Sequence, residues 1–417
     1  MESSPGGVNA APVLVARTRA VAPDLVTDLL RLVPPDGLTS WVRRGEGIVG
    51  WGQSAALRSR GGTRFSDASK WWAEVVAQAN VTDEVAEPGT GLVAFGSFAF
   101  ADEPGDSVLV VPSVVVGRRG DLAWVTTIGT SEVAAPELSP LERPAAPREV
   151  TFADGALDGG QWMSVVADAV ERINRGDLEK VVLARDLIAT AADPIDVRWP
   201  LQQLASTYPM CWTFHVDGLF GATPEMLVRR ERGLVTSRVL AGTIRRTGND
   251  EHDLALAGAL ARSSKDLEEH EYAVRSVADA LEPHCSSMNV PESPFVLHLP
   301  NVMHLATDVT GVARDAITSL QLAEALHPSA AVGGTPTAVA TALISQIEGM
   351  ERGRYAGPVG WMDSSGDGEW GIALRCARLD GATVRLFAGC GIVGSSDPQA
   401  ELAESNAKLH PVRESLG

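Results

Sequence analysis

The chain has 417 residues, of which 45% are hydrophobic and 21% charged, a composition typical of a large globular protein with a substantial core. Its formal net charge of −18 argues against a nucleic-acid partner, because binding to phosphates requires a basic surface. The same charge repels anionic substrates, so an anion site must be made locally favourable by arginines or a metal ion.

The cysteines and the first residues both predict a cytoplasmic location. Four cysteines are scattered along the chain without a CxxC pair or zinc-site spacing, so we expect reduced, mostly buried thiols. They are Cys211, Cys285, Cys376 and Cys390. The first residues lack the basic and apolar regions of a signal peptide. No apolar run is long enough for a membrane span, and we expect no membrane partner.

Residues 1–150 have the pattern of a sheet-forming segment. Strands are predicted at 12–21, 91–100, 107–116 and 122–128, a hairpin at 41–51, and helices at 24–32 and 67–80. The strands follow one another with short turns, which favours antiparallel pairing. No motif here carries chemistry. The proline-rich stretch 131–148 is predicted to be a surface linker.

A lysine begins the first predicted strand after this linker. An amphipathic helix is predicted at 160–175, and the apolar strand 180–185 (KVVLAR) follows it. Lys180 at the start of a buried strand is most often an edge residue with an exposed amine. If it is desolvated beside a substrate, its pKa falls and it can act as a general base. The residues alone leave both interpretations open.

A glutamate follows a later strand in a similar way. Glu225 comes directly after Pro224, where the predicted strand ends in a turn or a helix start. It is either a carboxylate stabilised by a helix N-terminus or a general acid at the rim of a cleft. The small residues Ala241, Gly242 and Thr243 end the next strand, where a backbone can approach a ligand closely.

The C-terminal part combines a small-residue turn with a charged helix. The run 389–393 (GCGIV) precedes Asp397 and Pro398, which favour a helix start. Glu401, Glu404 and Lys408 then have the spacing of one helix face. A solvated face with an ordinary ion pair is the common explanation of this pattern.

A second acidic pair favours a metal site instead. Asp266 and Glu269 lie on another predicted helix, 265–281. Four carboxylates that meet in one pocket repel each other unless a hard cation such as Mg²⁺ lies between them.

An arginine in a later apolar stretch needs an anionic partner. We predict a strand at 370–378 with Arg375 inside it, and a buried arginine requires a neutralising group. Tyr355 precedes the neighbouring strand and could converge with Arg375 on a carboxylate. The glycine-rich loop 329–336 lacks the lysine of a P-loop and is a weak anion-site signal.

These separated motifs, taken in order, resemble the chorismate-utilising enzymes, which include isochorismate, anthranilate, aminodeoxychorismate and salicylate synthases. The matching stretches are 180–185 (KVVLAR), 221–225 (GATPE), 241–243 (AGT), 269–270 (EH), 327–328 (HP), Tyr355, Arg375 and the run from 389 to Lys408. The resemblance is strong over residues 150–417 and faint before them.

The resemblance implies an α+β fold of two packed, largely antiparallel β-sheets flanked by helices. Residues 1–150 would be a sheet-forming part of the same unit, and 151–417 the catalytic region. Mg²⁺ would be held mainly by Glu269 and Glu404, with Asp266 and Glu401 in support, and would bind the ring carboxylate of chorismate. Tyr355, Arg375 and the backbone of Gly389 and Gly391 would hold the enolpyruvyl carboxylate, with Lys408 neutralising the site.

A few positions favour isochorismate synthase, an isomerase. Lys180 stands where ammonia-using relatives typically have glutamine, so no amidotransferase subunit is expected. Lys180 would activate water for attack at C2 while Glu225 protonates the leaving C4 hydroxyl. Ala241 replaces the nucleophilic lysine of many aminodeoxychorismate synthases, and Ala331 stands where salicylate synthases tend to have threonine. Cys390 departs from the usual alanine.

Three other functions remain possible. A salicylate synthase would add pyruvate elimination to the same isomerisation. A Mg²⁺-dependent hydrolase would use the carboxylates but would not explain Lys180, Glu225 and Arg375 together. A non-catalytic binding protein would not need a paired base and acid. The isochorismate would feed menaquinone or catechol siderophore biosynthesis.

Overall fold

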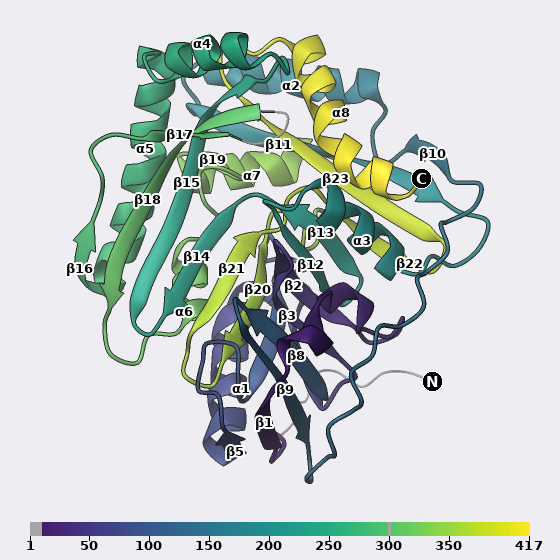
Figure 1. Cartoon of the computed structure of the whole chain (residues 1–417). Helices are drawn as coiled ribbons and strands as arrows, with labels where there is room; N and C mark the ends of the chain where they lie inside the picture. Colours follow the sequence, from purple (N-terminus) through teal and green to yellow (C-terminus); the bar gives the residue numbers. More distant parts are fainter. Residues whose placement is uncertain (1–10, 299–301) are drawn as a thin grey trace.

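Two large β-sheets form the framework of the chain in a computed structural model, which describes residues 11–298 and 302–417 apart from the side chains of Lys265 and Glu269 (Figure 1). The first sheet has 13 strands, in the order β10-β11-β23-β22-β13-β12-β2-β3-β8-β9-β1-β5, with β19 also pairing β11. Their bounds are β1 Val15–Val21, β2 Thr39–Arg43, β3 Glu46–Trp51, β5 Asn80–Asp83, β8 Val114–Arg119, β9 Leu122–Gly129, β10 Thr151–Asp154, β11 Lys180–Thr190, β12 Trp212–Val216, β13 Leu219–Thr223, β19 Gly334–Thr335, β22 Cys376–Asp380 and β23 Thr383–Ile392.

The second sheet has ten strands, in the order β16-β18-β15-β14-β21-β20-β6-β7-β4, with β17 also pairing β18. Their bounds are β4 Ala55–Ser59, β6 Val93–Ser97, β7 Ser107–Val111, β14 Met226–Glu231, β15 Leu234–Arg245, β16 Cys285–Asn289, β17 Phe295–His298, β18 Val302–Ala313, β20 Pro358–Asp363 and β21 Gly368–Ile372. Among the strand pairs of the described residues only β1 and β5 are parallel, so the predicted fold class is confirmed.

Eight α-helices flank the sheets in the described part of the chain (Figure 1). They are α1 Arg64–Gln78, α2 Gly159–Asn174, α3 Arg198–Thr207, α4 Asp250–Leu260, α5 Ser264–Leu281, α6 Ser319–Ala325, α7 Thr337–Ile347 and α8 Pro398–Ser415. α5 packs on β15 and β18, and α8 packs on β23. No helix among the described residues combines the length and the apolar character that crossing a bilayer requires.

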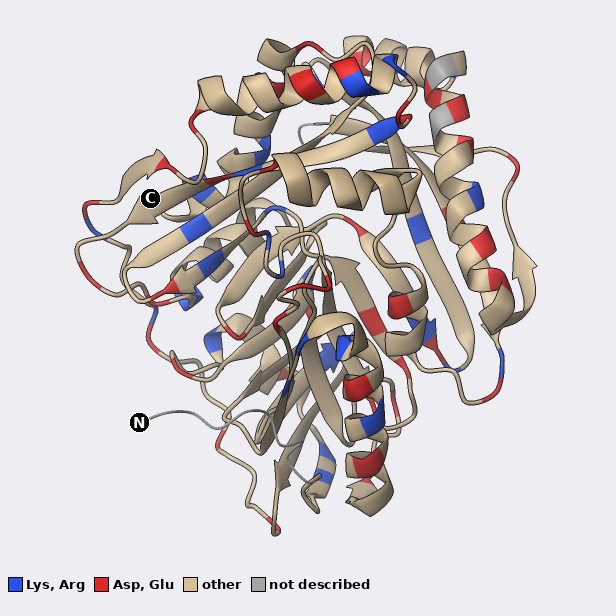
Figure 2. Cartoon of the chain, turned by 180° about the vertical axis from the view of Figure 1, so that it is seen from behind, with Lys and Arg blue, Asp and Glu red and all other residues tan. Residues whose placement is uncertain are grey.

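The main core lies between the two sheets. One cluster of buried side chains joins Trp41 and Phe214 of the 13-stranded sheet to Phe95 and Trp370 of the ten-stranded sheet. A second cluster on the outer face of the larger sheet includes Phe220, which points away from the main core because successive strand residues alternate between faces. Charged residues lie mostly on helices and loops, and the strands are largely uncharged (Figure 2).

Strands from both ends of the chain complete both sheets. β2 pairs with β12, where Trp41 lies opposite Phe214, and β6 pairs with β20, where Phe95 lies opposite Trp361. The stretch 131–148 has no regular secondary structure. The helix predicted at 24–32 is wrong, because the extended backbone of Asp28 separates two short 3₁₀ turns, Pro23–Val26 and Leu29–Arg31.

Candidate active site

Two neighbouring chain segments pass from one sheet to the other at the same level. The first leaves the larger sheet at the end of β13 and enters the smaller sheet as β14, with Glu225 between the two strands. The second leaves β21 and enters β22, with Arg375 between them. Backbone hydrogen bonds join the segments, from Ile372 N–H to Glu225 O (3.1 Å) and from Ala222 N–H to Arg375 O (3.2 Å). The crossing therefore places Glu225 and Arg375 side by side in the fold.

The crossing corrects one prediction about local structure and decides between the two alternatives left open at Glu225. Residues 370–378 are not one strand, because β21 and β22 pair with partners in different sheets and the chain must turn between them. Arg375 takes a left-handed conformation in this turn, with φ of 48°, which is costly for a residue with a side chain. Glu225 likewise lies between two strands and not at a helix start.

The first residues of β11 face two glycines of β23. β11 and β23 pair so that Val182 lies opposite Gly391 and Ala184 opposite Gly389. A Cβ atom at position 391 would lie 3.0 Å from Cε of Lys180, and one at position 389 would lie 2.9 Å from the Tyr355 hydroxyl. The glycines therefore make room for the side chains of Lys180 and Tyr355.

Tyr355 is held rigidly beside this strand. It is 3% exposed, and its ring stacks on Phe387 of β23 at 5.2 Å between ring centroids. Burial raises the pKa of its hydroxyl, which is therefore a neutral donor at physiological pH.

The first turns of α8 present the predicted carboxylates toward β23. Glu404 forms an ion pair with Lys408 (2.6 Å), and the Lys408 ammonium also donates to Gly389 O (2.9 Å). Glu401 accepts a hydrogen bond from Ser396 (2.8 Å). One potential ligand atom from each of Cys390, Glu401 and Glu404 lies within 4.8 Å of the others. The Cys390 thiol itself points to the backbone oxygen of Glu401 at 3.4 Å.

The opposite wall comes from α5 and β15. Asp266 of α5 packs against Gly242, where a Cβ atom would lie 3.2 Å from that of Asp266. Gly242 has a φ of 76° at a bulge between Ala241 and Thr243. Glu269 lies on α5, one helical turn after Asp266, but its side chain is outside the described part of the structure.

One histidine that the sequence analysis did not select lies at this wall. His304 of β18 is opposite Thr243, and its Nδ1 lies 2.9 Å from the Thr243 hydroxyl. Desolvation, together with the charges of Arg375 and Lys408, lowers the pKa of His304 to about 4, so the ring is neutral. A single histidine in a strand has no sequence signal, and only the register of β15 on β18 brings it to the site.

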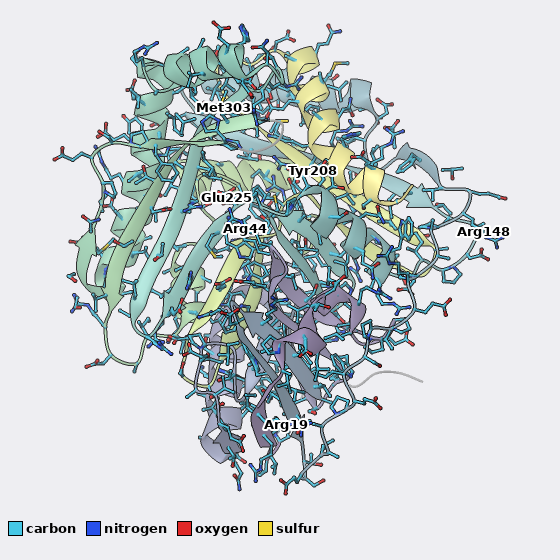
Figure 3. The ribbon with its side chains drawn as sticks, in the orientation of Figure 1. Arg19, Arg44, Arg148, Tyr208, Glu225 and Met303 are labelled. Carbon is cyan, nitrogen blue, oxygen red and sulfur yellow. The ribbon has the colours of Figure 1, made fainter. Side chains whose placement is uncertain are left out.

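The cations around Glu225 do not offset its desolvation. Desolvation raises the pKa of Glu225 to about 7, although the charges of Arg375, Lys180 and Lys408 each act to lower it. A small cavity of about 30 Å³ touches Glu225, Ala331, Arg238 and Ser329, and it has room for about one water molecule. Figure 3 shows Glu225 in the middle of the molecule, far from Arg19 and Arg148 at its edges.

The two glutamates of α8 have opposite pKa shifts. Desolvation and the neighbouring Glu404 raise the pKa of Glu401. Desolvation acts in the same direction on Glu404, but Lys408, Arg375 and Arg245 outweigh it and lower the pKa of that carboxyl. Glu404 is therefore ionised near neutral pH, and its side chain is 48% exposed. Carboxylate oxygens of this kind are the donors that hard divalent cations prefer, so these residues fit such an ion.

Comparison with known proteins gives consistent results. Residues 39–417 match the family described as chorismate binding enzyme. The chain is 32% identical over 401 residues to isochorismate synthase MenF of Bacillus subtilis, which covers 89% of this chain and 85% of that protein. It is 34% identical over 407 residues to the salicylate biosynthesis isochorismate synthase of Pseudomonas aeruginosa, with 90% and 84% covered. A crystal structure of DhbC from Bacillus anthracis superimposes with a TM-score of 0.77 at 31% identity, covering 93% of this chain and 98% of that one.

Proposed function

The chain belongs to the family of chorismate-binding enzymes, and from this premise we propose that it is an isochorismate synthase, an isomerase that converts chorismate to isochorismate. The observation that carries the proposal is that Lys180, which lies over Gly391, is near enough to the buried Glu225 for its charge to lower the pKa of that carboxyl, which desolvation raises. Relatives whose names include isochorismate synthase match this chain at 32% and 34% identity over most of their length.

The proposed reaction needs a base and an acid at two ring carbons. Lys180 takes a proton from water while the water oxygen bonds to C2 of the ring. The double bonds shift, the C4–oxygen bond breaks, and Glu225 gives its proton to the departing hydroxyl, which leaves as water. The ammonium of Lys180 and the carboxylate of Glu225 then return to their starting forms by exchanging a proton through solvent.

Cations and small residues around this pair are proposed to bind the substrate. Arg375 and Tyr355 would hold the enolpyruvyl carboxylate together with the backbone at Gly389 and Gly391, and Lys408 would neutralise the remaining charge. The contacts that support this are the Lys408 bond to Gly389 O and the Tyr355 hydroxyl beside Gly389. The ring would lie against a wall made by Ala241, Gly242, Thr243 and Ala331.

We propose Mg²⁺ as the cofactor, held by Glu269 and Glu404 with support from Asp266 and Glu401. Bound there, the ion would neutralise these carboxylates and bind the ring carboxylate of chorismate. Cys390 is a poor ligand for Mg²⁺, because a hard cation prefers oxygen to sulfur. Its contact with the Glu401 backbone supports a packing role instead.

Several further statements belong to the proposal. The product would feed menaquinone or catechol siderophore biosynthesis, and no amidotransferase subunit is needed because water is the nucleophile. The four cysteines are all free thiols, which supports a cytoplasmic location. Residues 1–150 would belong to the same unit as residues 151–417, as the shared sheets suggest.

The test is to incubate the protein with chorismate, Mg²⁺ and ammonium and to identify the product by mass spectrometry. Isochorismate alone is expected, and the variants Lys180→Ala and Glu225→Ala should each lose about 10²-fold or more in rate while still binding chorismate. Salicylate with pyruvate would indicate a salicylate synthase. Anthranilate as the main product, or a fully active Lys180→Ala variant, would contradict the assignment of Lys180 as the base.

A further inference from the structure

Among the described strands, the edge of β11 that faces away from β23 has a partner at each end and none in its middle. β19 pairs with Lys180 and Val181, and β10 pairs with residues 187–190. Residues 182–186 lie between these pairings along the same edge. Backbone groups in a buried strand need hydrogen-bond partners, because an unpaired group there is costly.

Side chains take the place of the missing strand. An Arg352 nitrogen donates to Val182 O (2.6 Å), and the Ala184 N–H donates to Oε2 of Glu348 (2.9 Å). The indole of Trp162 then donates to Ala184 O (3.0 Å). Side chains thus satisfy three backbone groups in the middle of the edge, while backbone bonds from the Val182 N–H to Gly333 O and from the Gly155 N–H to Asp186 O lie on either side of them.

Arg352 and Glu348 are themselves a tightly bonded, buried ion pair. Two parallel hydrogen bonds of 2.7 and 2.6 Å join the guanidinium to the carboxylate. Their side chains are 3% and 1% exposed. The guanidinium also lies 4.2 Å from the ring centroid of Phe100. A planar fork with five N–H donors can make all these contacts at once, whereas a lysine cannot.

The same pair also contacts two other parts of the proposed site. Arg352 donates to Val332 O (2.9 Å), next to Ala331 on the glycine-rich loop. The backbone oxygen of Arg352 accepts from the Tyr355 N–H (3.1 Å). One buried ion pair is therefore bonded to the start of β11, to the loop at Ala331 and to the segment that carries Tyr355.

We propose that Arg352 and Glu348 are positioning residues that hold the start of β11, and with it Lys180, in place over Gly391. This inference rests on the proposed function, in which Lys180 is the base. Lys180 lies only two residues before Val182, so its position depends on how the strand is held there. The side chains of the pair bond to the backbone of Val182, Ala184 and Val332, which are not among the proposed substrate-binding residues. A displacement of about 1 Å of a catalytic group can cost about 10²-fold in rate.

The first test is Arg352→Lys, which keeps the charge and loses the fork. We expect kcat to fall about tenfold or more while KM changes by less than about threefold, because Arg375, the proposed substrate anchor, lies in the turn between β21 and β22, away from the start of β11. Amide hydrogen exchange at Ala184 should become faster, because Glu348, which accepts from the Ala184 N–H, loses the two-bond contact that fixes its carboxylate. A wild-type kcat together with unchanged exchange at Ala184 would overturn the proposal.

The matched control is Arg385→Lys, which weakens another ion pair that contacts β11, formed by Arg385 of β23 and Asp186 of β11. Arg385 donates to Asp186 of β11 at 2.6 Å, and the Asp186 carboxylate is buried and also accepts from the Ala156 N–H. This pair lies toward the far end of β11 from Lys180. We expect a comparable loss of thermal stability with kcat unchanged. If kcat fell equally in both variants, general destabilisation would explain the loss of activity in Arg352→Lys. That result would overturn the positioning role.

A double variant, Glu348→Leu with Arg352→Met, tests the positioning of β11 apart from any contribution of the ion pair to the stability of the protein. Replacing a buried pair by apolar side chains of similar volume often leaves a protein folded. We expect a cooperatively folded protein with low kcat and fast exchange at Ala184. A folded double variant with wild-type kcat would contradict the proposal. If the wild-type protein made no isochorismate, the proposed function would fail instead. The exchange measurement would still show whether Arg352 and Glu348 hold the start of β11.

Discussion

At the scale of single residues, Glu225 sets the expected pH dependence. Desolvation raises the pKa of its carboxyl to about 7, against the pull of the neighbouring cations. The proposed acid needs the protonated form, which predominates below that pKa. We therefore predict that kcat/KM falls above about pH 7, approaching about tenfold per pH unit. Rates measured from about pH 6 to pH 9 test this.

The variant Glu225→Gln supplies the control for that profile. It cannot ionise, so its low residual rate should lose the fall at high pH. A wild-type profile that stays flat across this range, or a variant that keeps the same fall, would assign the titration to another group.

Gly389 of β23 is the basis of a second prediction at the scale of single residues. A Cβ at position 389 would lie 2.9 Å from the Tyr355 hydroxyl, so Gly389→Ala should cost about 1–3 kcal/mol of stability through overpacking and should also lower activity. Removing the hydroxyl in Tyr355→Phe should restore part of the stability, which chemical denaturation would measure. If the double variant Gly389→Ala with Tyr355→Phe recovered no stability, the added Cβ would clash with an atom other than the Tyr355 hydroxyl.

The residues of the site were predictable to different degrees. Lys180, Glu225 and Arg375 stand out in the sequence because a charged side chain beside an apolar, buried strand requires a neutralising partner or a function. His304 has no such signal, and the pair Glu348 and Arg352 has the spacing of an ordinary surface ion pair on a helix. Its burial follows only from the gap along β11, which depends on strands that are distant in the sequence.

At the scale of elements, α8 begins where local signals predict. The carboxylate of Asp397 accepts from the Ala400 N–H at 2.8 Å, and Pro398 occupies the first helical position. Asp397→Ala should cost about 1 kcal/mol of stability. It should also raise the Mg²⁺ concentration needed for half-maximal activity, because Glu401 and Glu404 lie in the first turns of this helix. A Mg²⁺ titration of initial rates measures that shift.

α2 provides a matched control for the cap. Asp158 accepts from the Gln161 N–H at 2.8 Å, the same interaction at the start of a helix without a proposed ligand. Asp158→Ala should lose similar stability and leave the Mg²⁺ requirement unchanged. If both variants needed the same Mg²⁺ concentration for half-maximal activity, the α8 cap would have no role in metal binding and the prediction would be contradicted.

The crossing of the two segments could not be predicted from the sequence. Residues 370–378 form one mostly apolar stretch, and only their different partners divide it into β21 and β22. A helix cap is a local interaction, whereas these strand ends are fixed by pairing with distant parts of the chain.

At the scale of the whole molecule, a bound cation should join α5 to α8. We predict that a chelator abolishes activity and that Mg²⁺ restores it, with Glu269→Gln and Glu404→Gln both inactive though folded. Mg²⁺ should also raise the melting temperature of the wild-type protein, because a ligand of the folded state stabilises it. Both glutamine variants should lose that rise. Full turnover in chelator would contradict the shared site.

Glu414 of the same helix is the control for charge alone. It is exposed and pairs with His410 at 3.5 Å, away from the cluster. Glu414→Gln should keep both the activity and the rise in melting temperature.

The interleaving of distant strands has a consequence for the protein during its synthesis. β2 and β6 emerge from the ribosome long before β12 and β20, the strands that complete their edges. Until those arrive, the nascent chain carries two open, apolar strand edges, which are the usual templates for aggregation. Pairings of such long range also close slowly, because the loop entropy is lost before the contacts form. The unfinished chain should therefore be more prone to aggregation than the completed protein.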